Sequence, residues 1–147
     1  MSTRDLIGYG ANTPKFTWPN GARIAVSVVV NYEEGSEQSI LDGDPKGESG
    51  GESPSPMGPG ERDLANESFY EYGSRAGFWR LHRLFTERNI PVTVYGIAMA
   101  LERNPDAVAG MLEADWEIAS HGYRWIDYQY VSQAEEREHI THAIEIH

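Results

Sequence analysis

The hydrophobic positions of this chain predict three buried strands that alternate with helices. Residues 23–30 are almost continuously apolar and β-branched, which is typical of a strand covered on both faces. Shorter apolar runs at 92–95 and 116–119 predict two further strands. Strands covered on both faces occur in parallel sheets flanked by helices, so we expect an α/β fold.

Three helices are predicted between and after these strands. Residues 73–89 place apolar side chains at three- and four-residue spacing, and a proline follows two residues later. The segment 104–114 begins with an asparagine followed by proline, which is a strong helix start. A capping box at 132–135 begins the last helix. Strands and helices therefore alternate along the chain, as they do in parallel α/β proteins.

A long segment without periodicity, residues 36–60, separates the first predicted strand from the first predicted helix. Fifteen of its 25 residues are Gly, Pro or Ser, and acidic residues are interspersed among them. We expect a long loop that is mobile or is ordered only by a partner.

Composition and charge narrow the class of protein. The 147 residues are 39% hydrophobic and 24% charged, which is ordinary for a soluble globular domain. The net charge of −11 lacks the basic footprint that nucleic acid requires, so we expect no nucleic-acid partner. No apolar run reaches the roughly 20 residues of a membrane helix, and the N-terminus shows no signal-peptide pattern. We expect a cytoplasmic protein without a membrane partner. The absence of cysteine excludes disulfides and thiolate chemistry.

Two polar motifs follow predicted strands, where reacting groups collect in α/β sheets. They are Asn31-Tyr32-Glu33-Glu34-Gly35 and Ser120-His121-Gly122-Tyr123-Arg124-Trp125. One of the two adjacent carboxylates can become a general base through desolvation or its like-charged neighbour. The histidine can act as a catalytic group or a ligand. Alternatively, the two glutamates are solvated residues at the edge of a loop. The histidine can likewise be a structural residue held by a hydrogen bond.

Other candidate residues follow the second motif. Trp125, Asp127 and Tyr128 lie in a loop at the expected mouth of the sheet, where they either line a pocket for a planar or sugar-like ligand or pack the loop. His139 and His142 stand three residues apart on the last predicted helix. This spacing suits a metal, but no third ligand is evident nearby, so we assign both to a solvated helix face.

The two motifs resemble those of the polysaccharide deacetylase superfamily. In that family a Thr-Phe-Asp-Asp-Gly motif supplies the base and a metal ligand, and a His-Ser/Thr-x-x-His motif supplies two further ligands. The resemblance places Glu33 at the base position, Glu34 at the ligand position and His121 at the first histidine. Trp125 stands where the second histidine is expected. Because catalytic zinc normally has three protein ligands, this pattern implies a site without metal.

The first motif, with residues 67–81 and 117–122, resembles the cofactor-independent bacterial allantoinases of this superfamily. That resemblance implies a hydrolase that opens the ring of allantoin, a small-molecule substrate, and needs no cofactor. The implied catalytic residues are Glu33, Glu34 and His121, and the substrate-binding candidates are Asn31, Arg75, Trp125, Asp127 and Tyr128. Two alternatives stay open, namely a metal-dependent carbohydrate de-N-acetylase, which would use zinc, and a truncated inactive chain.

The resemblance also implies a fold. It extends from about residue 4 to the last residue and corresponds to the N-terminal part of a distorted (β/α) barrel, so we treat residues 1–147 as one partial domain. Three strands cannot close such a barrel, because closure fixes strand number, tilt and stagger together. An incomplete barrel leaves a sheet edge unpaired, so we expect the chain to form a homo-oligomer.

Overall fold

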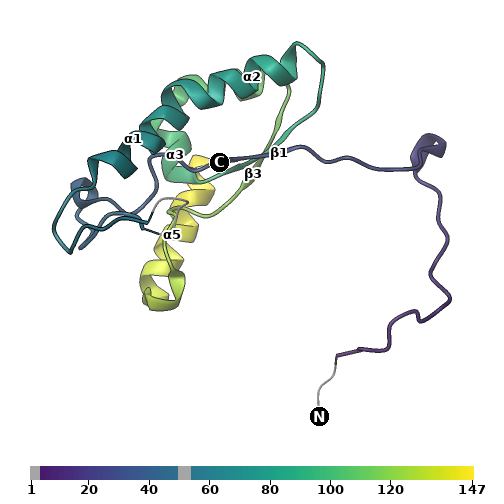
Figure 1. Cartoon of the computed structure of the whole chain (residues 1–147), viewed down its shortest axis with the longest axis horizontal. Helices are drawn as coiled ribbons and strands as arrows, with labels where there is room; N and C mark the ends of the chain where they lie inside the picture. Colours follow the sequence, from purple (N-terminus) through teal and green to yellow (C-terminus); the bar gives the residue numbers. More distant parts are fainter. Residues whose placement is uncertain (1–3, 50–53) are drawn as a thin grey trace.

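A three-stranded parallel sheet forms the centre of the molecule (Figure 1). The computed structural model describes residues 4–49 and 54–147. The strands are β1 (Val29–Tyr32), β2 (Thr93–Gly96) and β3 (Glu117–Ser120), and β2 lies in the middle. In the register of the sheet, Val30 pairs with Val94, and Val94 pairs with Ile118. The predicted α/β alternation is therefore present.

The helices follow the strands as the sequence predicts, with two additions. Their bounds are α1 (Leu64–Tyr72), α2 (Phe78–Thr86), α3 (Ala98–Arg103), α4 (Pro105–Glu113) and α5 (Gln133–Ile146). A π-helical segment, Gly73–Gly77, joins α1 to α2, so the two run on as one long rod (Figure 1). Helices α1 and α3 are absent from the sequence prediction. Within residues 4–49 and 54–147, no helix has the length and apolar character needed to cross a membrane.

The helices cover one face of the sheet. Tyr32, Val94 and Ile118 pack on that face against the side chains of α2, α3 and α4, and Phe78, Met111 and Trp116 complete this core. The opposite face carries Asn31 and Tyr95, which are exposed. Period-two alternation along each strand produces this division. The expectation that the first strand is covered on both faces is therefore wrong in this structure.

The first strand is also shorter than the sequence predicts. Apart from turns at 8–11 and Pro19–Gly21, residues 4–28 form an extended arm that runs away from the sheet (Figure 1). Ile24 and Val26 in this arm are 73% and 78% exposed. Their apolar, β-branched character favours an extended backbone. It does not supply a neighbouring strand, and the sheet begins only at Val29.

The long loop after β1, expected to be mobile or ordered only by a partner, makes several contacts within the chain. A 3-10 turn, Ile40–Asp42, lies in its middle. Arg103 of α3 binds the Asp42 carboxylate through both terminal nitrogens, at 2.7 and 3.0 Å. The Glu48 N–H donates to the Gln38 carbonyl at 2.9 Å. Residues 50–53 of this predicted loop lie outside the described residues.

Candidate functional site

The candidate site lies at the carboxyl ends of β1 and β3, on the sheet face opposite the helices. Asn31 lies beside Tyr95 in the sheet, and Tyr95 lies beside Ala119. Glu33 follows two residues after Asn31, and His121 follows two residues after Ala119. Because side chains alternate along a strand, both continue on the same open face.

Glu33 and His121 form the central contact of this site. Glu33 Oε1 lies 3.1 Å from His121 Nε2, and the same oxygen accepts a hydrogen bond of 3.1 Å from the Asn31 side-chain amide. The Glu33 and His121 side chains are 21% and 40% exposed, so water reaches both. The imidazole stacks on Tyr95 with 5.6 Å between ring centroids and an interplanar angle of 26°. A carboxylate beside an imidazole can serve as a general base paired with an acid.

Glu34 lies apart from this pair. Its carboxylate occupies the space next to Gly73, on the helix-covered side of β1, and a Cβ atom at Gly73 would lie 2.7 Å from Glu34 Cγ. The Glu33 N–H donates to Glu34 Oε2 at 3.3 Å. The structure therefore brings together two of the three catalytic candidates and directs the third into the π-helical segment.

Burial governs the chemistry of Glu34. Loss of water raises the pKa of its carboxyl above the ordinary value of 4.5, because a low-dielectric environment disfavours the charged form. Hydrogen bonds from backbone N–H groups oppose this shift, and the nearby carboxylates Glu33 and Glu37 add to it. Glu34 is thus a desolvated acid held by helix packing.

The predicted substrate-binding residues occupy several places. Asn31 contacts Glu33 directly, as described above. The backbone N–H of Trp125 donates to the Ser36 carbonyl at 3.0 Å. The Trp125 ring lies near the Tyr70 ring, with 6.3 Å between centroids. Trp125 thereby joins the loop after β3 to the loop after β1.

The other three candidates make local contacts. Arg75 projects from the π-helical segment and pairs with Glu71 at 3.4 Å. Asp127 caps the turn Tyr128–Tyr130 by accepting from the Gln129 N–H. The Tyr128 hydroxyl lies 3.0 Å from His139 Nδ1 on α5. None of these contacts joins Arg75, Asp127 or Tyr128 to the Glu33–His121 pair in the part of the chain that the structure describes.

The site includes two further residues, Tyr95 and Arg124, which the sequence alone did not mark as candidates. Tyr95 supports the His121 ring, and Arg124 reaches from the second motif to the acidic loop after β1. The alternation of side chains along β2 is a signal that could have placed Tyr95 on the open face. The partner of Arg124 is Asp44, which is remote in sequence, and local patterns carry no such signal.

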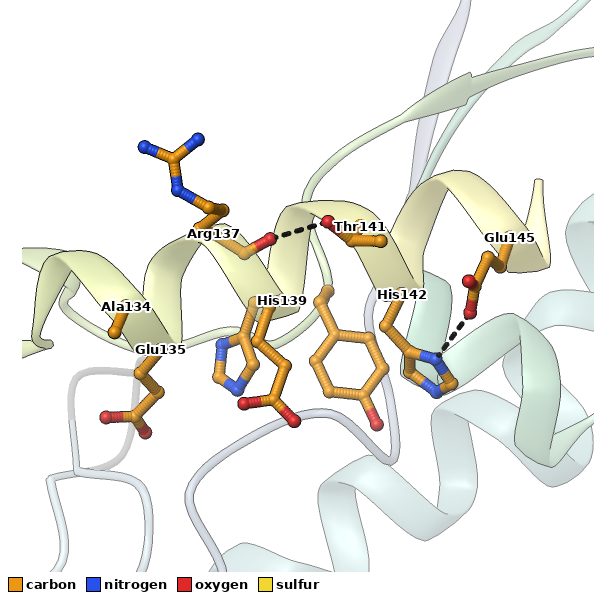
Figure 2. Close-up of a pocket in the computed structure, with 9 residues that line it drawn as sticks. Ala134, Glu135, Arg137, His139, Thr141, His142 and Glu145 are labelled. Atoms are coloured by element: carbon orange, nitrogen blue, oxygen red, sulfur yellow. Dashed lines mark hydrogen bonds and ion pairs between the residues drawn. The ribbon is translucent and has the colours of Figure 1, made fainter.

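A hollow of about 880 Å³ lies along α5 (Figure 2), and neither Glu33 nor His121 is among the residues that line it. The Tyr123 ring packs between His139 and His142, with centroid distances of 5.0 and 4.8 Å. Both histidines are partly exposed and line this hollow, and the His142 side chain is 42% exposed, in keeping with the expected solvated helix face. Across residues 4–49 and 54–147, no three His, Asp or Glu side chains gather so as to hold a metal ion.

Comparison with known proteins shows the family of the chain. Residues 68–146, more than half of the chain, match the family model described as polysaccharide deacetylase. The chain belongs to the polysaccharide deacetylase family. A protein of Schizosaccharomyces pombe described as a putative polysaccharide deacetylase is 46% identical over 97% of this chain. The match covers 46% of that protein, so the chain spans about half the length of the curated relative.

Solved structures of this family share the fold. The crystal structure of PuuE allantoinase and that of a probable polysaccharide deacetylase from Pseudomonas aeruginosa PAO1 each match with 51% identity and a TM-score of 0.84. Each match covers 99% of this chain and 49% of the other. A putative polysaccharide deacetylase from Mycobacterium smegmatis is 23% identical, with a TM-score of 0.65, and supports the fold alone. The resemblance to part of a deacetylase-type (β/α) fold is therefore confirmed.

The contact between Glu34 and Gly73 yields a prediction about stability. A methyl group at Gly73 overlaps the Glu34 carboxylate, so Gly73→Ala should lower the free energy of unfolding by about 1–3 kcal/mol. Gly77→Ala is the matched control, because its Cβ would lie 3.6 Å from Tyr72, an ordinary contact, and should not destabilise. Urea unfolding measures both. Equal losses in the two variants would contradict the assigned overlap.

The raised pKa of Glu34 yields a second prediction. The folded state binds this proton more tightly than the unfolded state, so the contribution of Glu34 to stability falls as the pH rises above about 4.5. The free energy of unfolding of Glu34→Gln, relative to that of the wild type, should therefore be higher at pH 7 than at pH 4. Urea unfolding at both pH values measures the difference. Glu113→Gln, at the end of α4, controls for removing one charge from an acidic chain, and an equal gain there would refute the assignment.

Proposed function

We propose that the Glu33–His121 pair is the catalytic centre of a hydrolase that opens a cyclic amide, with allantoin as the substrate. The observation that carries the proposal is the 3.1 Å contact between a base and a proton donor on the open face of the sheet. The likeness to PuuE allantoinase, at 51% identity over 99% of the chain, supports this substrate class.

The chemistry divides between the two side chains. The Glu33 carboxylate removes a proton from water, and the resulting hydroxide attacks the amide carbon of the ring to form a tetrahedral intermediate. His121, in its protonated form, donates a proton to the leaving nitrogen as the carbon–nitrogen bond breaks. The Asn31 amide holds Glu33 by its hydrogen bond, and Tyr95 supports the imidazole plane.

A metal-dependent carbohydrate de-N-acetylase is the second candidate. The family model, the Schizosaccharomyces pombe relative and the Pseudomonas aeruginosa structure favour this candidate. The Pseudomonas aeruginosa structure has the same identity and TM-score as the allantoinase. The donor set does not fit a zinc site of the expected kind. An indole at Trp125 offers no ligand, and Glu34 lies beside Gly73 instead of facing His121. We therefore propose a reaction that needs no metal or other cofactor.

A parallel assay tests the proposed substrate. The purified chain is incubated with allantoin and with an N-acetylglucosamine oligomer, each with and without a chelator. We expect allantoate from allantoin at a rate that the chelator leaves unchanged. Acetate release without allantoate, or loss of activity on chelation, would move the protein to the deacetylase class. Turnover of neither substrate would favour the third possibility, an inactive chain, since the chain spans about half of its relatives.

The two glutamates give a matched test of the assigned roles. Glu33→Gln should lower kcat on allantoin by about 100- to 10,000-fold, because the substitution removes the general base. Glu34→Gln removes a neighbouring carboxylate that faces Gly73, so its kcat should stay much closer to that of the wild type. Steady-state kinetics measure both variants. A larger loss in Glu34→Gln than in Glu33→Gln would reverse the assignment.

A further inference from the structure

The loops that carry Glu33 and His121 are joined by an ion pair between Arg124 and Asp44, which stand 80 positions apart in the sequence. We propose that Arg124 and Asp44 are positioning residues that hold His121 at its contact distance from Glu33, an inference that rests on the proposed function of the same site. Neither side chain contacts substrate in this proposal. Both act through the backbone of the loops that they join.

The ion pair has the geometry of a strong link. Arg124 Nη2 lies 2.6 Å from Asp44 Oδ2, and Arg124 Nη1 lies 3.1 Å from Asp44 Oδ1, so the guanidinium binds the carboxylate through two parallel bonds. Both side chains are only 14% exposed. Arg124 Nη2 also donates to the Glu37 carbonyl at 3.3 Å, and the Ser39 N–H donates to Asp44 at 2.8 Å. The loop after β1 therefore closes around the guanidinium.

The link continues from the ion pair to the catalytic base. Directly after Arg124, the Trp125 N–H donates to the Ser36 carbonyl at 3.0 Å. Ser36 is fully buried, and its hydroxyl and backbone N–H both donate to the Glu33 carbonyl, at 2.5 and 3.0 Å. One continuous series of bonds thus runs from Arg124 to the residue whose carboxylate contacts His121.

The other side of the His121 loop is fixed independently. The His121 N–H donates to the Gly96 carbonyl at 3.0 Å. The Gly122 and Tyr123 carbonyls accept from the N–H groups of Ala98 and Met99, at 2.9 and 3.1 Å. These bonds hold the loop to β2 and α3. Arg103 of α3 also binds the Asp42 carboxylate and the Gly35 carbonyl of the loop after β1, so α3 contacts both loops. The Arg124–Asp44 pair and the Trp125–Ser36 bond join the two loops directly.

The pair is suited to hold its geometry across the working pH range. Burial alone would raise the pKa of Asp44, but hydrogen bonds from Arg124 and the Ser39 N–H outweigh it and leave that pKa below its ordinary value. The carboxylate therefore stays charged at neutral pH. Catalytic geometry tolerates displacements of about half an ångström, so loss of this link should separate the base from the imidazole.

The His121 ring nitrogens provide a direct readout of this separation. In the full chain, a long-range ¹H–¹⁵N NMR spectrum reports the hydrogen bond at Nε2, and His121→Gln assigns the signals. Arg124→Ala and Asp44→Asn should both shift the Nε2 signal toward that of a free imidazole. Exchange of the Trp125 amide should accelerate at least tenfold. Arg124→Lys, which keeps the charge but not the paired bonds, should give an intermediate result.

Arg62→Ala is the matched control, because Arg62 also binds a carboxylate through two bonds, that of Glu67, and stands just before α1, 18 residues beyond Asp44 in the same connection. It should leave the Nε2 signal and the Trp125 amide unchanged. Amide protection in β2 monitors the fold of every variant. The proposal is overturned if Arg124→Ala leaves the Nε2 signal in place, or if Arg62→Ala shifts it equally.

Kinetics separate this proposal from the proposed function. With allantoin as the probe, Arg124→Ala should lower kcat at least tenfold and change KM by less than threefold, because a positioning residue contributes to the reacting geometry. A wild-type chain without allantoinase activity would contradict the proposed function, and the NMR comparison would still decide the role of Arg124. A fall in kcat with an unchanged Nε2 signal would overturn the positioning role.

Discussion

The alternation of side chains along β1 is the constraint on which the rest of the site depends. Tyr32 points into the core against Phe78, with 5.3 Å between ring centroids and less than 2% of its surface exposed. Its hydroxyl accepts a hydrogen bond of 2.7 Å from the Asn104 side chain, which also caps α4. With Tyr32 fixed in this way, Asn31 and Glu33 must lie on the open face and Glu34 on the helix face.

This constraint gives two adjacent glutamates different environments. Glu33 remains near water and beside His121, while Glu34 is desolvated next to a glycine in a π-helical segment. π-Helical segments inside longer helices often occur at functional sites. Here the segment provides space, since only a residue without a side chain at position 73 leaves room for the Glu34 carboxylate. The geometry separates two acids that the sequence presents as an equivalent pair.

The sequence predicted those parts of the fold that local signals determine. The β2 and β3 runs and the caps at Asn104 and Ser132 lie within one or two residues of the observed bounds. Helix α1 was missed because large apolar side chains such as Phe69 stay exposed and no clear apolar stripe marks it. Helix α3 was missed because it is short and mostly buried. The apolar run at residues 23–28 predicts a buried strand, but burial depends on neighbouring elements of the tertiary structure, which a local sequence pattern does not determine.

The site was predictable to a similar degree, and for the same reason. Motif position identified Glu33 and His121 because strand ends meet at one edge of a parallel sheet. It did not identify the Arg124–Asp44 link, because the partners are far apart in sequence and both belong to loops. The result is a division of roles along the chain. Short motifs after the strands carry the candidate reacting groups, and the long acidic loop, which carries no catalytic candidate after Glu34, is bonded through Asp44 and Ser36 to the segment that follows His121.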